Sequence, residues 1–150
     1  MLTQKAKYAL RSLAVLAAAD PRVPLPIHEI ADRAHAPQKF LEAILLELRR
    51  HGVLASTRGK AGGYVLARPA AEVRVGDVIR MVDGPLAPLP CASLTAYRPC
   101  ADCPDPERCS IRNVMRRVRD ATAAILDNTS IGDLAADPAA FDAMVAEAAA

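Results

Sequence analysis

The residues best suited to chemistry in this chain are four cysteines that lie within 19 residues of one another and nowhere else. They are spaced as Cys91-x8-Cys100-x2-Cys103-x5-Cys109. Thiolates are soft ligands that suit an iron–sulfur cluster or zinc, and such a site needs about four of them unless another donor helps. Cysteine pairs can also switch by reversible disulfide formation without a metal. The pattern predicts a metal or redox site, and a cluster, zinc, a disulfide switch and idle thiols all stay open.

The segment Gly84–Arg108 carries all of these cysteines except Cys109, and it holds six prolines and no apolar periodicity. A long loop of this kind is usually functional or disordered. Cys109 directly precedes a predicted helix, so the helix dipole favours its thiolate. Three acidic residues nearby, Asp102, Asp105 and Glu107, partly oppose that effect.

A second set of residues has side chains of the kinds that contact base edges. Gln38, Lys39 and Glu42, with Phe40 among them, open a predicted helix over Gln38–His51. Gln can pair with an adenine edge, Lys with guanine or a phosphate, and Glu can accept from cytosine N4. The alternative is an ordinary solvent-exposed helix face.

Shortly after that helix comes a basic, glycine-rich segment, RGKAGG, between two strand-like runs, Val53–Thr57 and Tyr64–Ala67. Its first three residues are Arg58, Gly59 and Lys60. Glycines let the backbone approach a duplex, and an arginine there can enter a narrow minor groove. We interpret the segment as the tip of a DNA-binding wing, with a merely flexible hairpin tip as the alternative.

The elements that must position these residues begin with a helix over Gln4–Ala19, preceded by Thr3 as a plausible N-cap. Lys5, Lys7 and Tyr8 on this helix could hold phosphates. We therefore count Thr3, Lys5 and Tyr8 among the DNA-binding candidates.

Next, a short helix over Ile27–His35 is followed by Ala36-Pro37 and then by the helix that begins at Gln38. A residue before proline is pushed out of the helical region, whereas proline is tolerated in a first helical turn. Helix, tight break and second helix together predict a helix-turn-helix. A further short helix is expected over Val75–Asp83.

The longest predicted helix covers Ser110–Asn128 and has one apolar side at heptad-like spacing. That side consists of Ile111, Met115, Val118, Thr122 and Ile125, widened by Val114 and Ala121. Such spacing is typical of a helix that pairs with another helix, so we expect it to pair with a second copy or to pack on its own domain. Arg112, Arg116 and Arg119 share another face, which we interpret as solvent-exposed or as neutralising an anionic cluster.

These elements predict a mainly α fold with a small β-hairpin wing. We divide the chain into a winged helix-turn-helix DNA-binding domain at 1–83, a cysteine-containing sensor loop at 84–109, and a dimerisation helix with a helical tail at 110–150. Ala-rich helical pieces are expected over Ile131–Ala136 and Pro138–Ala150.

Charge and composition favour a nucleic-acid partner over a membrane. Residues 1–70 carry 11 Lys/Arg and 5 Asp/Glu, whereas residues 71–150 carry 8 and 12. A basic half joined to an acidic half indicates a polyanion partner for the first. No apolar run approaches the roughly 20 residues that span a bilayer, and the charged N-terminus is unlike a signal peptide. We therefore expect a cytoplasmic protein without membrane contact.

Two other classes of function are compatible with parts of the sequence. An enzyme or electron-transfer protein could be built on the cysteine loop, but no nucleophile–base pair or phosphate-binding glycine loop is present, so we predict that the chain is not an enzyme. The other is a DNA-binding module whose cysteine loop only braces the fold, through zinc for example.

The sequence resembles the Rrf-two family of winged helix transcriptional regulators, which includes IscR, NsrR and RirA. The segments that carry the resemblance are Thr3–Ala17, Lys39–Pro69 with its RGKAGGYVLAR stretch, Val75–Leu86 and Cys91–Leu134. It implies a homodimer, paired by the long C-terminal helix, that binds double-stranded DNA at a pseudo-palindromic operator. Half-sites would then lie roughly one helical turn, about 34 Å, apart.

The resemblance also implies roles for individual residues. The recognition helix of the family corresponds to Gln38, Lys39, Phe40 and Glu42, and its minor-groove wing to the Arg58–Lys60 segment. Phe40 departs from a tyrosine that is frequent in the family and would lack one phosphate hydrogen bond.

In cluster-binding members of this family, three cysteines hold the iron, and Cys91, Cys103 and Cys109 match them best. Arg112 stands where the IscR type has a histidine ligand, and arginine cannot replace it. Cys100 is extra and could be the fourth ligand of a 2Fe-2S or 4Fe-4S cluster. We then expect the state of the loop to bias the arrangement of the Val75–Asp83 helix and the long helix. This arrangement would set the separation of the two DNA-reading heads of the dimer.

Overall fold

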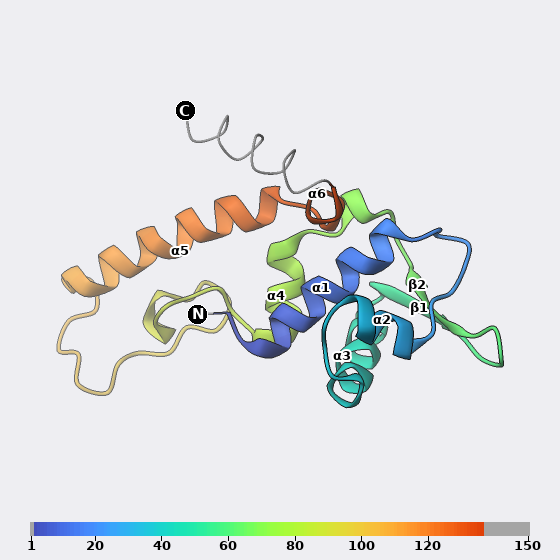
Figure 1. Ribbon diagram of the computed structural model, residues 1–150. Coiled ribbons are helices and arrows are strands. Elements are labelled where there is room, and N and C mark those ends of the chain that lie inside the picture. The colour runs from blue at the N-terminus through green and yellow to red at the C-terminus, as the bar shows by residue number, and fades with distance from the viewer. Residues whose placement is uncertain (1, 137–150) are drawn as a thin grey trace.

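The computed structural model describes residues 2–136 and is mainly helical, with one two-stranded antiparallel hairpin (Figure 1). The fold class expected from the sequence is confirmed. The elements are α1 (Gln4–Ala18), α2 (Ile27–Arg33), α3 (Gln38–Arg50), β1 (Leu54–Thr57), β2 (Gly63–Leu66), the 3-10 turn η1 (Ala70–Glu72), α4 (Val75–Asp83), the 3-10 turn η2 (Pro90–Ala92), α5 (Ser110–Asn128) and α6 (Ile131–Ala135). Both 3-10 turns lie in segments for which the sequence pattern predicted no helix or strand. The expected helix over Pro138–Ala150 lies outside the described residues.

Helix α1 runs through the middle of the fold and packs against α2, α3, α4 and α6. Thr3 caps it by accepting a hydrogen bond from the backbone N–H of Ala6 at 3.1 Å. Small residues on its inner face, such as Ala6 and Ala9, are fully buried and let the neighbouring helices approach closely. Ser12 is also fully buried, and its hydroxyl donates to the Tyr8 carbonyl at 2.8 Å, so this buried polar group has a hydrogen-bond partner.

Helices α2 and α3 form the predicted helix-turn-helix. The turn between them places His35 at φ 49, in the left-handed region, and Pro37 occupies the N-cap position of α3. The inward side of α3 is built from four core residues, namely Leu41, Ile44, Leu45 and Leu48. Because this side is buried, the residues on the opposite side of α3 are the ones exposed to solvent.

The β1–β2 hairpin is joined to the segment before α2 through β2. Its register pairs Leu54 with Leu66 and Thr57 with Gly63, and an isolated bridge joins Leu25 to Tyr64. A Cβ at Gly63 would lie 2.2 Å from the carbonyl oxygen of Leu25, so this close approach requires glycine. The tip of the hairpin projects away from the body (Figure 1).

The long helix α5 is attached to the core at its C-terminal end. The N–H of Val75 donates to the Thr129 carbonyl at 2.9 Å, and the N–H of Ile131 donates to the Val73 carbonyl at 2.8 Å. Ile131, at the start of α6, is fully buried. The other end of α5 extends away from the helix-turn-helix and is reached through the loop after α4 (Figure 1).

An ion pair reinforces this attachment. Arg80 of α4 donates twice to the carboxylate of Asp127 on α5, at 2.7 and 2.8 Å. A Cβ at Gly76 would lie 1.9 Å from an oxygen of that carboxylate, so a larger residue at position 76 would displace the Asp127 side chain from its place beside Arg80. Within the described residues, no helix is long and apolar enough to cross a membrane.

Candidate nucleic-acid interface and cysteine loop

The first turn of α3 presents all four residues that the sequence analysis assigned to base recognition. Gln38, Lys39, Phe40 and Glu42 are exposed, and Phe40 retains 65% of its accessible surface. An exposed phenylalanine is not explained by packing within this chain. Apolar contact with a thymine methyl group is one use for such a side chain in the major groove.

The structure brings the start of α1 next to this turn. A shallow hollow of about 370 Å³ is lined by Gln4, Lys5, Tyr8, Phe40, Ala43 and Ile44. Lys5 and Tyr8, which the sequence analysis linked to phosphate binding, therefore share a surface with Phe40. Lys5 is also engaged within the protein, because its ammonium group lies 2.6 Å from a carboxylate oxygen of Glu47.

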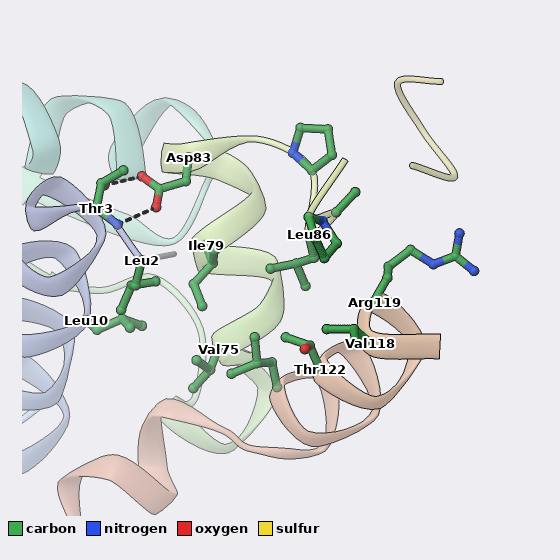
Figure 2. A pocket seen from close by; sticks show the side chains of 14 residues that line it. Leu2, Thr3, Leu10, Val75, Ile79, Asp83, Leu86, Val118, Arg119 and Thr122 are labelled. Carbon is green, nitrogen blue, oxygen red and sulfur yellow. Dashed lines mark hydrogen bonds between the residues drawn. The ribbon is translucent and has the colours of Figure 1, made fainter. Parts of the chain in front are cut away.

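Thr3 has a clear role inside the fold, whereas its contact with DNA stays a prediction. Besides capping α1, it donates through its backbone N–H to Asp83 at 3.0 Å and through its hydroxyl to the same carboxylate. These bonds tie the start of α1 to the end of α4 (Figure 2).

The tip of the hairpin is exposed and basic, as predicted for a wing. Arg58, Gly59 and Lys60 are all exposed. Gly59 has φ 103, a backbone conformation that favours glycine. Arg49 of α3 donates to the Ser56 hydroxyl of β1 at 3.0 Å, which links the two candidate DNA-reading elements.

The four cysteines differ in their surroundings. Cys91 is buried in η2, Cys100 is exposed, and Cys103 and Cys109 are intermediate. The Cys100 thiol donates to the sulfur of Cys91 across 3.8 Å, and this bond raises the pKa of Cys100 above its ordinary value. Cys109 is the N-cap of α5, where its sulfur accepts from the N–H of Arg112 at 3.4 Å. The position expected for Cys109 at the start of the long helix is therefore observed.

The structure brings Cys91 and Cys100 together but does not gather the whole ligand set. Between residues 2 and 136, no three Cys, His, Asp or Glu residues form a group that could hold a metal ion. The assignment of Cys91, Cys100, Cys103 and Cys109 as one site therefore stays a prediction.

Two arginines of α5 hold the turn η2, which contains Cys91, in place. These contacts were not predicted from the sequence. The side chain of Arg112 is only 14% exposed; its Nε donates to the Cys91 carbonyl at 3.0 Å, and its guanidinium lies 5.7 Å from the ring centre of Tyr97. Arg119 is 8% exposed and donates to the Ala92 carbonyl. The interpretation of these two as solvent-exposed was wrong, because their spacing shows a shared face but not the turn that covers it.

The apolar stripe of α5 lies on a different side from these arginines and is largely uncovered. Ile111 is 64% exposed, Val114 51%, Val118 44% and Ile125 68%. Next to it, a cavity of about 590 Å³ is lined by α1, α4 and α5, with Val118 and Thr122 of α5 facing Leu10 and Ile79 (Figure 2). A continuous apolar surface of this kind indicates an interaction site.

The comparison with known proteins decides the family. A family model described as "Rrf2: Iron-dependent Transcriptional regulator" matches residues 2–137. The chain belongs to the Rrf2 family. The matched family model and the relatives are named as transcriptional regulators, the relatives as regulators of the HTH type, so the general class of function expected from the sequence, a DNA-binding transcriptional regulator, is confirmed.

Individual Rrf2 relatives match over nearly the whole chain. A putative HTH-type transcriptional regulator, rrf2-like, from Rhodobacter capsulatus is 46% identical over 93% of this chain and 97% of its own length. The solved structure of CymR, the global cysteine regulator of B. subtilis, is 30% identical with a TM-score of 0.73, covering 90% of this chain and 95% of that one. The structure of T. potens IscR is 25% identical with a TM-score of 0.70, covering 89% and 85%.

Proposed function

We propose that this Rrf2 protein is a homodimeric regulator that binds a pseudo-palindromic duplex with α3 and the β1–β2 hairpin, and that the cysteine loop controls this binding. Residues 1–83 would read DNA, residues 84–109 would sense the signal and α5 would join two copies. The observation that carries the proposal is the exposed first turn of α3, whose opposite side is core. Gln38, Lys39 and Glu42 there offer hydrogen-bonding groups suited to base edges.

The exposed stripe of α5 supports a second copy as its partner. Monomeric soluble proteins rarely leave a contiguous apolar surface of this kind uncovered, and the cavity beside Val118 and Thr122 offers room for side chains from a facing helix. A two-fold pairing along α5 would hold two α3 helices in a fixed relation, as a palindromic site requires.

An iron–sulfur cluster is the cofactor that we propose for the loop. The donor set fits, since four thiolates are what such clusters take. Cys91, Cys103 and Cys109 would hold it, with Cys100 as fourth ligand, and the loop would close to gather them. When bound, the cluster supplies a centre that oxygen, nitric oxide or iron supply can alter. Arg112 and Arg119 of α5 donate to backbone carbonyls of η2. A movement of η2 on cluster binding would therefore be transmitted to α5.

A second candidate is a thiol–disulfide switch without metal. The distance of 3.8 Å between the sulfurs of Cys91 and Cys100 favours it, because only a small movement separates this geometry from a disulfide at about 2.05 Å.

The experiment that separates these cofactor chemistries is an ultraviolet–visible spectrum of anaerobically purified protein, with iron, acid-labile sulfide and zinc determined on the same sample. Visible absorbance with iron matching sulfide supports the cluster. A colourless, iron-free sample that resists reconstitution contradicts it, and its zinc content then distinguishes a zinc-braced loop from a disulfide switch.

A further inference from the structure

Cys91 and Cys100 form a pair with unequal access to solvent. Cys91 is 6% exposed within η2, whereas Cys100 lies on the surface 3.8 Å away. The sulfur of Cys109 is engaged elsewhere, by the N–H of Arg112 at 3.4 Å. One thiol of the pair can therefore meet a small solute while the other is shielded behind it.

The backbone between the two cysteines is already folded back on itself. The N–H of Arg98 donates to the Pro90 carbonyl at 3.2 Å, and the N–H of Ala96 donates to the Ser93 hydroxyl at 3.0 Å. The residues from Leu94 to Cys100 are all exposed, so Cys100 can shift without disturbing the core. A cross-link between the pair would close a loop whose ends are already together, at small cost in chain entropy.

The buried side of the pair is fixed to α5. The carbonyl oxygens of Cys91 and Ala92 accept hydrogen bonds from Arg112 and Arg119. Cys91 therefore has a defined position, and Cys100 is the partner that moves when a bond forms.

We propose that Cys91 and Cys100 are a dithiol that a hydroperoxide oxidises to an intramolecular disulfide, and that the oxidised pair cannot ligate iron. In the first step the Cys100 thiolate attacks the peroxide, giving a sulfenic acid and, from hydrogen peroxide, water. In the second step the Cys91 sulfur attacks the sulfenic sulfur, forming the S–S bond and releasing a second water. Two thiols lose two electrons and two protons, and one hydroperoxide takes them up.

Loss of both sulfurs would leave only Cys103 and Cys109 for a metal. The second half of this inference, the block of iron binding, rests on the proposed cluster function, whereas the disulfide does not.

The test starts from reduced, metal-free protein, which is treated with hydrogen peroxide, alkylated and digested with trypsin and chymotrypsin. Cleavage after Tyr97 separates the two cysteines, so a disulfide appears as a cross-linked pair of peptides. We expect this cross-link in the wild type and in the matched control Cys103→Ser, and its absence in Cys100→Ser. A cross-link formed equally well from Cys91 to Cys103 or to Cys109 would overturn the assignment.

The consequence for iron is measured on the same oxidised wild-type sample. Reconstitution with ferrous iron and sulfide should fail after peroxide treatment and recover after reduction with a dithiol. Equal iron incorporation into the oxidised and reduced forms would overturn the block. If neither form ever takes up iron, the block and the cluster proposal both fail, while peptide mapping still decides on the disulfide.

Discussion

At the scale of single residues, the exposed arginine of the hairpin tip is the sharpest test of DNA contact. We expect Arg58→Ala to weaken binding to duplex DNA by about 1–3 kcal/mol and to reduce the slope of log affinity against log salt by about one, because one cationic contact is lost. The measurement is fluorescence anisotropy with a duplex enriched from a random pool, repeated over a series of salt concentrations.

Arg98→Ala is the matched control, because it removes the same charge from the exposed part of the cysteine loop. If both variants weaken binding equally, the effect comes from net charge and the hairpin has no special contact.

A substitution at Arg119 tests how much its contact with η2 stabilises the fold. Arg119→Met keeps the aliphatic part of the side chain but leaves the carbonyl of Ala92, a residue that is 1% exposed, without its donor. An unpaired buried acceptor costs about 1–3 kcal/mol, so we expect the free energy of unfolding in urea to fall by that amount. Arg117→Met, at an exposed position of the same helix, should change it little. Equal stability of the two variants would show that the Arg119 contact contributes nothing.

The sequence identified candidate chemical groups at this scale better than it identified their partners. Cysteine clustering and the basic glycine-rich tip are local patterns, and both are visible along the chain. The bonds from Arg112 and Arg119 to η2 join residues 21 and 27 positions apart. No periodicity reports such a pairing, because it depends on how the loop folds back.

At the scale of elements, the contact between α4 and α5 rests on the bidentate pair of Arg80 with Asp127. The guanidinium of Arg80 lowers the pKa of Asp127 through its hydrogen bonds. A carboxyl group whose folded pKa is depressed contributes stability above its unfolded pKa of about 3.9, and this contribution is lost as pH falls through the folded value. The pair should therefore stabilise the folded protein at neutral pH but not in acid.

Asp127→Asn is expected to lower the free energy of unfolding by about 1 kcal/mol at neutral pH, because the pair is partly exposed and screened. The difference from the wild type should narrow as the carboxyl group protonates. Urea titrations at a series of pH values measure this. Asp77→Asn is the control, since Asp77 meets the same arginine at 3.2 Å but lies on the same helix, α4. A cost for Asp77→Asn as large as that for Asp127→Asn would contradict a specific link between the helices.

Apolar periodicity and turn residues were enough to place every α-helix expected within residues 2–136. The bounds of α4 and α5 agree with the expectation, and the other helices differ by two residues or fewer at their ends. The turns η1 and η2 were missed because each is only three residues long and forms no apolar stripe. Their shape depends on contacts with α5 and α6 that the local sequence does not reveal.

At the scale of the whole molecule, the apolar stripe of α5 should determine the oligomeric state. Ile125→Glu places a charge on a side chain that is 68% exposed in one chain but would be buried between two. We expect this variant to be monomeric by analytical ultracentrifugation, with its helical circular dichroism retained. It should also bind a palindromic duplex more weakly, because the two reading heads are no longer joined.

Ala124→Glu is the matched control, because Ala124 is exposed and lies outside the stripe. It should remain dimeric. A dimeric Ile125→Glu variant, or a wild type that is monomeric at all concentrations, would contradict pairing through α5.

In the whole molecule, we expect the state of the loop cysteines to set the affinity for DNA. The most direct test is the Kd of one protein preparation for one enriched palindromic duplex, measured at fixed salt in the reduced metal-free, iron–sulfur-reconstituted and peroxide-oxidised forms. We expect the affinity of at least one treated form to differ from that of the reduced form by about tenfold or more, a difference of about 1.4 kcal/mol. Equal, salt-sensitive binding in all three forms would contradict control by the cysteine loop, and no binding in any form would contradict the proposed DNA-reading surface itself.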